Sequence, residues 1–536
     1  MHHARSLARA PRVPEPARVA RWAALAAGGV VALWLLVLNF GALGAVAWRA
    51  AGLSALGPAD WAALRFTVVQ ALWSAGLSLL LAIPVARALA RRRFPGRNVL
   101  ITLLGAPFIL PTLVAVLGLL AVFGRSGLVN QGLEALGFAR FNIYGLHGVV
   151  LAHVFYNLPL ATRILLQGWG AIPSERFRLA ASLGFGPGAQ FRQLEWPMLR
   201  ELAPGAFLVI FLICLTSFSV ALTLGGGPRA TTVELAIYQA FRFDHDMGRA
   251  AALALMQFGL CALAAMFAWR LTLPSSLGGG LDRPVERFDR GGWGGRALDG
   301  SVIVLAALFL LTPLAMIAAR GLPHVAGLPV EVWQAAGRSL IVALGATALS
   351  MAFALALAHA ILALRGAGAA ALEGLGLAAL AASPLVIGTG LFVLMLPVVN
   401  PRDLALVVTM LVNAGMALPF ALRLILPGLR EVVATQGRLA ASLGLHGRAR
   451  LMIVTLPRLR RPLGFAAGLT AALSMGDLGV IMLFAEREGA TLPMQLYRLM
   501  TAYRQDDAAG AALVLLGTSL ALFWGFDRWG RGRAAA

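Results

Sequence analysis

The chain has 536 residues, of which 59% are hydrophobic and 13% are charged. Soluble domains carry about a quarter charged residues, so this composition excludes an ordinary soluble enzyme and indicates an integral membrane protein. The formal net charge of +22 would suggest nucleic acid as the partner of a soluble protein. Here the Arg residues gather in short connections between apolar runs, which is typical of membrane orientation, so we expect no nucleic-acid partner.

Twelve apolar runs are long enough to cross a bilayer, which takes about 20 residues. They fall near 22–47, 62–88, 98–123, 146–168, 201–224 and 248–271, and then near 298–319, 336–364, 371–397, 403–427, 462–485 and 507–526. The first run is longer than the apolar region of a signal peptide, so we expect a retained span. The sequence therefore predicts an all-α integral membrane protein with about twelve transmembrane helices.

The Arg residues lie mainly in alternate connections between these runs. With the N-terminus inside, the basic connections fall inside, namely the tail 1–21, the stretch 91–97, the loops 169–200 and 428–461, and the tail 528–536. The connections near 124–145, 225–247 and 486–506 carry mixed charge and fall outside. The positive-inside rule thus predicts that both termini are cytoplasmic.

A Gly-rich stretch at 272–297 separates the two sets of runs and is expected to be a cytoplasmic linker. The predicted first half is then 22–271, and the predicted second half is 298–527. Because each half has an even number of spans, both have the same orientation, as in a parallel repeat.

A seven-residue segment makes the repeat explicit. Arg178-Leu-Ala-Ala-Ser-Leu-Gly184 returns unchanged as Arg438-Leu-Ala-Ala-Ser-Leu-Gly444, 260 residues later, and Pro197 returns as Pro457 at the same offset. Helical spacing puts Phe177, Ala180, Ala181 and Gly184 on one face, and Gly184 is expected to end the helix. Two such segments favour a pair of short cytoplasmic helices that dock on a partner with two-fold symmetry; the alternative is two helices that pack only on their own bundle.

The chain cannot supply the energy for transport by itself. It contains no Lys, whereas a phosphate-binding P-loop needs a Lys to reach the nucleotide. Asp477 is the one clear carboxylate within an apolar run, and proton-coupled transporters usually hold more of them. The energy is therefore expected to come from separate nucleotide-hydrolysing subunits, and a secondary transporter with parallel repeats is the alternative from another class.

The repeated segments resemble the EAA loop of bacterial ABC importer permeases, in which a small-residue helix is followed by a Gly and, thirteen residues later, a Pro. Arg178 and Arg438 stand where that family has Glu. The resemblance implies contact with an ATPase subunit at Arg178, Leu179, Ala180, Ala181, Gly184 and Pro197 within the loop 171–200, and at Arg438, Leu439, Ala440, Ala441, Gly444 and Pro457 within the loop 430–460.

Nearly the whole chain resembles the fused permeases of thiamine ABC importers, through stretches such as Leu151–Pro159, Leu224–Gln239 and Gly476–Gly479. The resemblance implies the type I permease fold, a location in the bacterial inner membrane and transport of thiamine and its phosphate esters. It also implies two copies of an ATPase subunit and a periplasmic substrate-binding protein as partners. Fused ferric-iron permeases share much of this pattern and are the alternative.

Two polar residues within spans are candidates for the substrate pathway. Asp477 could lower the barrier for a cation such as the thiazolium ring of thiamine, and the alternative is a structural partner at a helix break. Asn157, in the fourth run, could either face the pathway or bond within its own helix. No cluster of His, Cys and carboxylates has metal-ligand spacing, and no nucleophile–base set is evident, so we expect no cofactor, no metal and no catalytic site.

Overall fold

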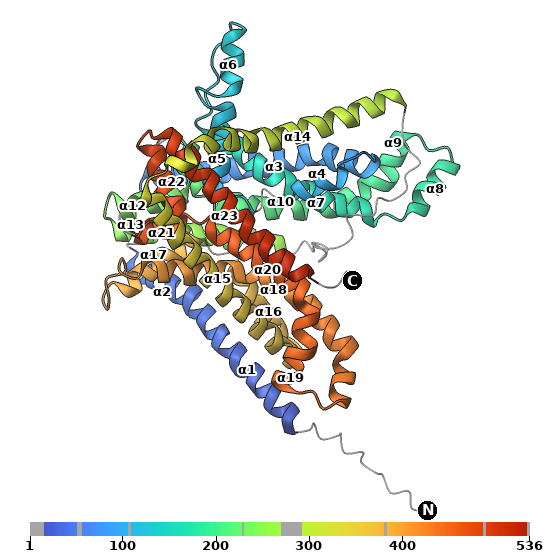
Figure 1. Ribbon diagram of the computed structural model, residues 1–536, viewed down its shortest axis with the longest axis vertical. Coiled ribbons are helices and arrows are strands. Elements are labelled where there is room, and N and C mark those ends of the chain that lie inside the picture. Colours follow the sequence, from blue (N-terminus) through green and yellow to red (C-terminus); the bar gives the residue numbers. More distant parts are fainter. Residues whose placement is uncertain are drawn as a thin grey trace, which may run out of the picture.

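The computed structural model describes residues 15–50, 56–104, 109–227, 230–269, 292–379, 383–485 and 489–532, and within these ranges every regular element is a helix. Figure 1 shows the arrangement. The first half contains α1 (Glu15–Leu36), η1 (Val37–Gly41), α2 (Ala42–Arg49), α3 (Pro58–Arg91), α4 (Arg97–Leu103), α5 (Thr112–Phe123), α6 (Leu128–Ala135), α7 (Leu146–Ala171), α8 (Ser174–Ser182), α9 (Pro187–Gln190), η4 (Phe191–Glu195), α10 (Trp196–Leu215), α11 (Ser219–Leu224), α12 (Val233–Arg242) and α13 (Met247–Trp269). The second half contains α14 (Trp293–Gly321), η6 (Leu322–Gly327), α15 (Val330–Ala363), α16 (Ala367–Ala378), α17 (Pro384–Met395), α18 (Ala405–Ser442), α19 (Gly447–Arg450), η8 (Leu451–Thr455), α20 (Leu456–Met475), α21 (Gly479–Phe484), α22 (Leu492–Thr501) and α23 (Gln505–Arg531).

Eleven helices in the described ranges are long and apolar enough to cross a membrane. This confirms the predicted all-α membrane fold. The predicted run 371–397 is not one helix: it falls on the shorter helices α16 and α17, and residues 380–382 between them lie outside the described ranges. Most of the predicted linker, 272–291, also lies outside them.

The two halves repeat helix by helix. α3 and α15 have 34 residues each, α10 and α20 have 20, α12 and α22 have 10, and α11 and α21 have 6. At 1.5 Å per residue, α3 and α15 are about 50 Å long, which exceeds the ~30 Å hydrocarbon core of a bilayer. These two helices must therefore tilt or extend beyond the membrane.

The first helix of each half packs against the other half. A Cβ added to Gly28 of α1 would lie 2.2 Å from the Ala360 Cβ of α15, so the two backbones are in close contact. In the first half, a Cβ on Gly118 of α5 would lie 2.8 Å from the carbonyl oxygen of Pro313 in α14. Small residues permit such approaches between membrane helices. The predicted halves are thus contiguous in sequence but exchange their first helices in space.

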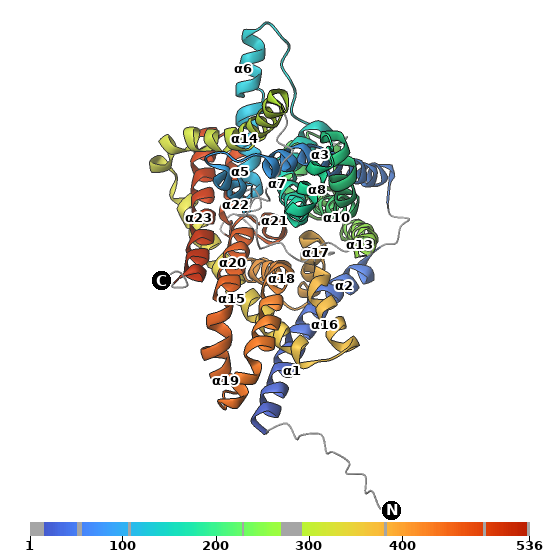
Figure 2. The same cartoon turned by 90° about the vertical axis from the view of Figure 1, so that its right-hand side faces the viewer.

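Figures 1 and 2 show how the exchanged helices sit in the molecule. The other helices of the first half run toward α8 and α9 together with α14, and those of the second half run toward α19 together with α1, in a different direction (Figure 1). Helices α12, α17, α21 and α22 lie near the other ends of these two groups, where the halves meet. Helix α6, in the connection between α5 and α7, projects beyond the rest in both views. The equivalent connection in the second half, between α17 and α18, has fewer than ten residues.

Candidate functional site

The two repeated segments form helix ends with the same geometry. Helix α8 and helix α18 both end two residues before a glycine in the left-handed conformation, with φ +70° at Gly184 and +68° at Gly444. The next amide in each copy donates back to a helix carbonyl: Phe185 to Ala180 and Leu445 to Ala440, both at 2.9 Å. This is a glycine-terminated cap that satisfies the last carbonyl groups, and it confirms the predicted helix end at each glycine.

Only part of the predicted face of these segments is exposed. Phe177 and Ala180 are buried against the bundle, whereas Ala181 and Gly184 are exposed. The outward face carries two leucines one turn apart in each copy, Leu179 and Leu183 in the first and Leu439 and Leu443 in the second. Their exposed fractions are 60%, 62%, 61% and 65%, nearly identical between copies. Each half thus presents the same apolar ridge, which we call the leucine ridge.

The second segment is not a separate loop helix as predicted for 430–460. Helix α18 continues without interruption from Ala405 through the segment to Ser442, whereas the first copy is divided between α7 and α8 at Pro173. The position equivalent to Pro173 is Val433. Proline disfavours a helical residue before it and lacks a backbone donor, so its presence in one copy accounts for the difference.

A π-helical turn connects each segment to the next membrane helix. These turns are η4 and η8, and Pro197 and Pro457 lie in the first turn of α10 and α20 after them. In the first half, Glu195 of η4 is fully buried and accepts a hydrogen bond from Arg87 Nε at 2.6 Å. The Arg87 guanidinium also lies over the Phe191 ring at 5.2 Å. Arg87 of α3 therefore fixes the turn from two sides.

The arginines in place of the family's Glu are at the surface. Arg178 is exposed and forms an ion pair with Glu175 at 3.2 Å within α8. Arg438 is also exposed. Both side chains are therefore available at the edge of the leucine ridge.

A second feature common to both halves is a break in a membrane helix. Helix α10 is separated from α11 by residues 216–218, and α20 from α21 by residues 476–478. At the 260-residue offset, Ser217 in the first break corresponds to Asp477 in the second.

Each break contacts the preceding long helix through a polar pair. His153 of α7 contacts Ser217 Oγ through Nε2 at 2.7 Å and Ser74 Oγ through Nδ1 at 3.1 Å. The equivalent of His153 is Asn413, which interacts with the Asp477 carboxylate and donates to Ser474 Oγ at 3.0 Å. Asp477 also interacts with the backbone amides of Gly479 and Val480 at the start of α21. Asp477 is partly exposed as a residue, and its Oδ2 atom has no hydrogen-bond partner among the described residues.

The hydrogen bonds of the Asn157 side chain go to helix residues and not to residues of the two breaks. Asn157 is buried, and its side-chain nitrogen donates to the His153 carbonyl at 2.9 Å and to Cys214 Sγ at 3.4 Å. The first of these bonds lies within α7, and the second reaches α10.

The chain has been compared with known proteins. No family model matches it. The thiamine transport system permease protein ThiP of Brucella abortus (strain 2308) is 40% identical over 521 residues, covering 95% of this chain and 96% of the relative. ThiP of Escherichia coli (strain K12) is 41% identical, covering 86% and 88%, and ThiP of Haemophilus influenzae is 34% identical, covering 91% and 93%. The chain belongs to the ThiP permease family.

As a ThiP family member, the chain is a multi-pass inner-membrane transport protein. The helix repeat and the broken helices are then features of a permease rather than of a catalytic site. In the part of the chain that the structure describes, no group of His, Cys, Asp and Glu residues is placed to hold a metal ion.

A buried carboxylate of this ThiP family member, Glu234, lies where the sequence predicts an exposed connection. Glu234 was expected in an exposed connection at 225–247, but it lies on α12 and is fully buried. Its polar neighbours are the side chains of Ser383, which precedes α17, and Gln257 of α13. The amphipathic spacing of Glu234, Tyr238 and Phe241 was the available signal, because it puts all three on one helix face.

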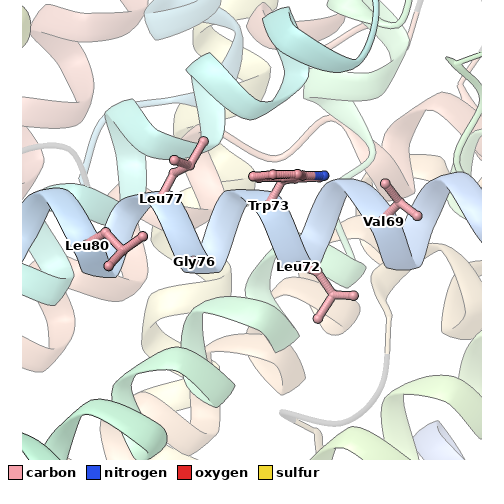
Figure 3. A pocket seen from close by; sticks show the side chains of 6 residues that line it. All are labelled: Val69, Leu72, Trp73, Gly76, Leu77 and Leu80. Atoms are coloured by element: carbon pink, nitrogen blue, oxygen red, sulfur yellow. The ribbon is translucent and has the colours of Figure 1, made fainter.

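Figure 3 shows a surface hollow on α3 that does not resemble a substrate site. It is lined by apolar side chains and one glycine: Val69, Leu72, Trp73, Gly76, Leu77 and Leu80. Trp73 and Leu80 are largely exposed. An apolar, outward-facing hollow on a membrane helix is a surface for lipid chains, and a cationic substrate would find no polar group in it.

Proposed function

We propose that this chain is the membrane-spanning subunit of an ATP-driven importer that moves thiamine, and its phosphate esters, into the cytoplasm. The observation that carries the proposal is the identity of 34–41% with ThiP proteins over most of the chain. Those relatives are named for thiamine transport, and the matched region covers 88–96% of their length.

The two leucine ridges support a partner that is present in two copies. They have the same sequence, the same glycine-capped end and the same exposure, so one kind of surface can bind both. We assign them to two ATPase subunits, in line with the EAA-loop resemblance. A membrane protein without Lys needs such a partner to use nucleotide.

The basic connections support the orientation of the chain. Both ridges lie in Arg-rich segments, as do residues 91–97 at the end of α3. Positive charge is retained on the cytoplasmic side, so the ridges, both termini and the ATPase subunits are assigned to that side. A periplasmic binding protein is assigned to the opposite side, from which thiamine is delivered.

The connections between ridge and membrane helix explain how movement could be transmitted. The second ridge is the end of the continuous helix α18, so displacement of the ridge moves a membrane helix directly. The first ridge is held through the turn η4, which Arg87 attaches to α3. Approach of two ATPase subunits would draw these attachments together and change which side of the membrane the central site faces.

Asp477 is assigned to the substrate pathway because it lies in a helix break, is partly exposed as a residue, and has a buried carboxylate oxygen, Oδ2, that has no hydrogen-bond partner among the described residues. A carboxylate in this place attracts a cation and would lower the cost of moving the thiazolium ring out of water. Ferric iron is the competing substrate.

Substrate competition tests the proposal. The permease is reconstituted into proteoliposomes with its ATPase subunit and binding protein, and uptake of labelled thiamine is measured against a hundredfold excess of unlabelled thiamine or of ferric iron. We expect thiamine alone to compete. Uptake of iron without uptake of thiamine would contradict the proposed substrate.

A further inference from the structure

A fully buried carboxylate outside the two repeated features calls for a role. Glu234 is 0% exposed, and neither of its carboxylate oxygens has a hydrogen-bond partner among the described residues. Burying a carboxylate without partners costs several kcal/mol if it is charged. A buried carboxylate with a strongly perturbed pKa is a candidate functional group.

The surroundings of Glu234 favour the neutral form in this conformation. Burial raises the pKa of Glu234 to about 8 and outweighs the contacts with Ser383 and Gln257, which lower it; α12 lies outside the long apolar helices. The neighbouring Gln257 donates its amide hydrogen to the Leu215 carbonyl at 2.9 Å, and its Oε1 atom has no partner within the described ranges. A protonated Glu234 has a hydrogen to offer to that oxygen, whereas a charged one has none.

Aromatic side chains extend from Glu234 along the same helix face. Tyr238 packs edge-on against Phe218 with ring centroids 5.4 Å apart, and Phe241 packs edge-on against Phe392 at 4.7 Å. Phe392 belongs to α17 of the second half, so this face of α12 lies at the boundary between the halves. A carboxylate beside aromatic ring faces is the combination that recognises organic cations.

Glu234 lies near the same helix start as the break that contains Asp477. Ser383, which interacts with Glu234, directly precedes α17. The first turn of α17 carries Leu385, whose Cδ1 atom lies 3.5 Å from a Cβ added to Gly479, two residues after Asp477. One carboxylate thus comes from each half, on either side of the start of α17. The repeat does not duplicate Glu234, because its equivalent in α22 is Pro493.

We propose that Glu234, with Tyr238 and Phe241, forms a second station for the positively charged ring of the substrate, occupied when the two halves separate at α12 and α17. This inference rests on the proposed function, in which the substrate is the cation thiamine. In the closed boundary the aromatic rings pack on one another and the acid is neutral. When the boundary opens, the acid becomes charged and the rings offer their faces to the thiazolium ring.

The substitution Glu234→Gln distinguishes this role of Glu234 from a structural one. A glutamine preserves size and hydrogen bonding but cannot carry charge, so a structural acid would tolerate the change. The full importer, with ATPase subunit and binding protein, is reconstituted as Glu234→Gln, as Glu234→Asp and as the control Glu134→Gln, which alters an exposed acid near the end of α6. Thiamine uptake, assembly of the complex and ATP hydrolysis are measured for each.

We expect Glu234→Gln to lower thiamine uptake at least tenfold while assembly and ATP hydrolysis stay within twofold of the unaltered protein. Glu234→Asp should recover part of the uptake, and Glu134→Gln should match the unaltered protein. Unchanged uptake in Glu234→Gln, with assembly and ATP hydrolysis retained, would overturn the proposal.

A second variant decides the matter if Glu234→Gln fails to fold. Tyr238→Leu keeps apolar bulk and removes a ring face, and it should raise the thiamine concentration needed for half-maximal uptake at least fivefold. Full affinity in Tyr238→Leu would then overturn the proposal. Failure of the proposed function would be distinct, because the unaltered importer itself would take up no thiamine.

Discussion

Ser217 and Asp477 hold the same position in the two halves, 260 residues apart, and each lies in a break between two aligned helices. Ser217 contacts His153, and Asp477 interacts with Asn413, which is the equivalent of His153. The scaffold of the break is therefore duplicated while its charge is not. This asymmetry makes the chemistry of the two positions separately testable.

Asp477→Asn should lower thiamine uptake by at least tenfold, because it removes the negative charge and keeps the shape of the side chain. Ser217→Ala alters the equivalent break without changing charge and should leave uptake within threefold. Uptake by proteoliposomes containing the full importer measures both. Equal effects of the two substitutions would show that Asp477 serves the helix break and not the cation.

The leucine ridges should account for most of the affinity for the ATPase subunit. Burying one leucine contributes about 1.5–3 kcal/mol, so Leu179→Asp or Leu439→Asp should weaken the corresponding contact by roughly ten- to hundredfold. Co-purification of the ATPase subunit with the double variant measures the loss. Leu136→Asp, at an exposed leucine after α6, is the matched control, and retention of the ATPase subunit by the double variant would refute the docking surface.

The exchanged first helix predicts different outcomes at two adjacent glycines. Gly28→Ala would place a Cβ 2.2 Å from that of Ala360, whereas a Cβ at Gly29 meets no atom within 4 Å. Overpacking of this kind costs about 1–3 kcal/mol, while alanine in an open helix position gains up to about 1 kcal/mol over glycine. The midpoint of thermal unfolding in detergent should therefore fall for Gly28→Ala and stay level or rise for Gly29→Ala. A similar midpoint for both variants would argue against the close packing of α1 on α15.

The contacts between Arg87 of α3 and the π-helical turn η4 predict a loss of stability when Arg87 in the first half is replaced. Arg87→Ala removes the cation bonded to the fully buried Glu195 and should cost on the order of 2 kcal/mol or more. Arg178→Ala breaks an exposed ion pair and should leave the unfolding midpoint unchanged. An Arg87→Ala variant with an unchanged unfolding midpoint would contradict the proposed rigid connection between the first leucine ridge and α3.

The parts predicted from the sequence are those in which a local signal determines a local structure. The seven identical residues, with a glycine as the last of them, and the Arg-rich connections identified the repeat and both helix ends. The continuous course of α18 could also have been predicted, because Val433 stands where the first copy has Pro173.

The parts not predicted depend on packing between distant segments. The exchange of α1 and α14 rests on contacts at Gly28 and Gly118, and two glycines among 60 carry no mark of such contacts. The burial of Glu234 was missed because mixed charge suggested an exposed connection. Tertiary packing instead covers α12 with helices of both halves.

The most direct test of the account is ATP-driven uptake of labelled thiamine by proteoliposomes that contain the permease, its ATPase subunit and its binding protein. The account predicts accumulation that requires ATP and the binding protein, and that falls to background in the variant with Leu179→Asp and Leu439→Asp. Undiminished ATP-driven accumulation by that variant would contradict it.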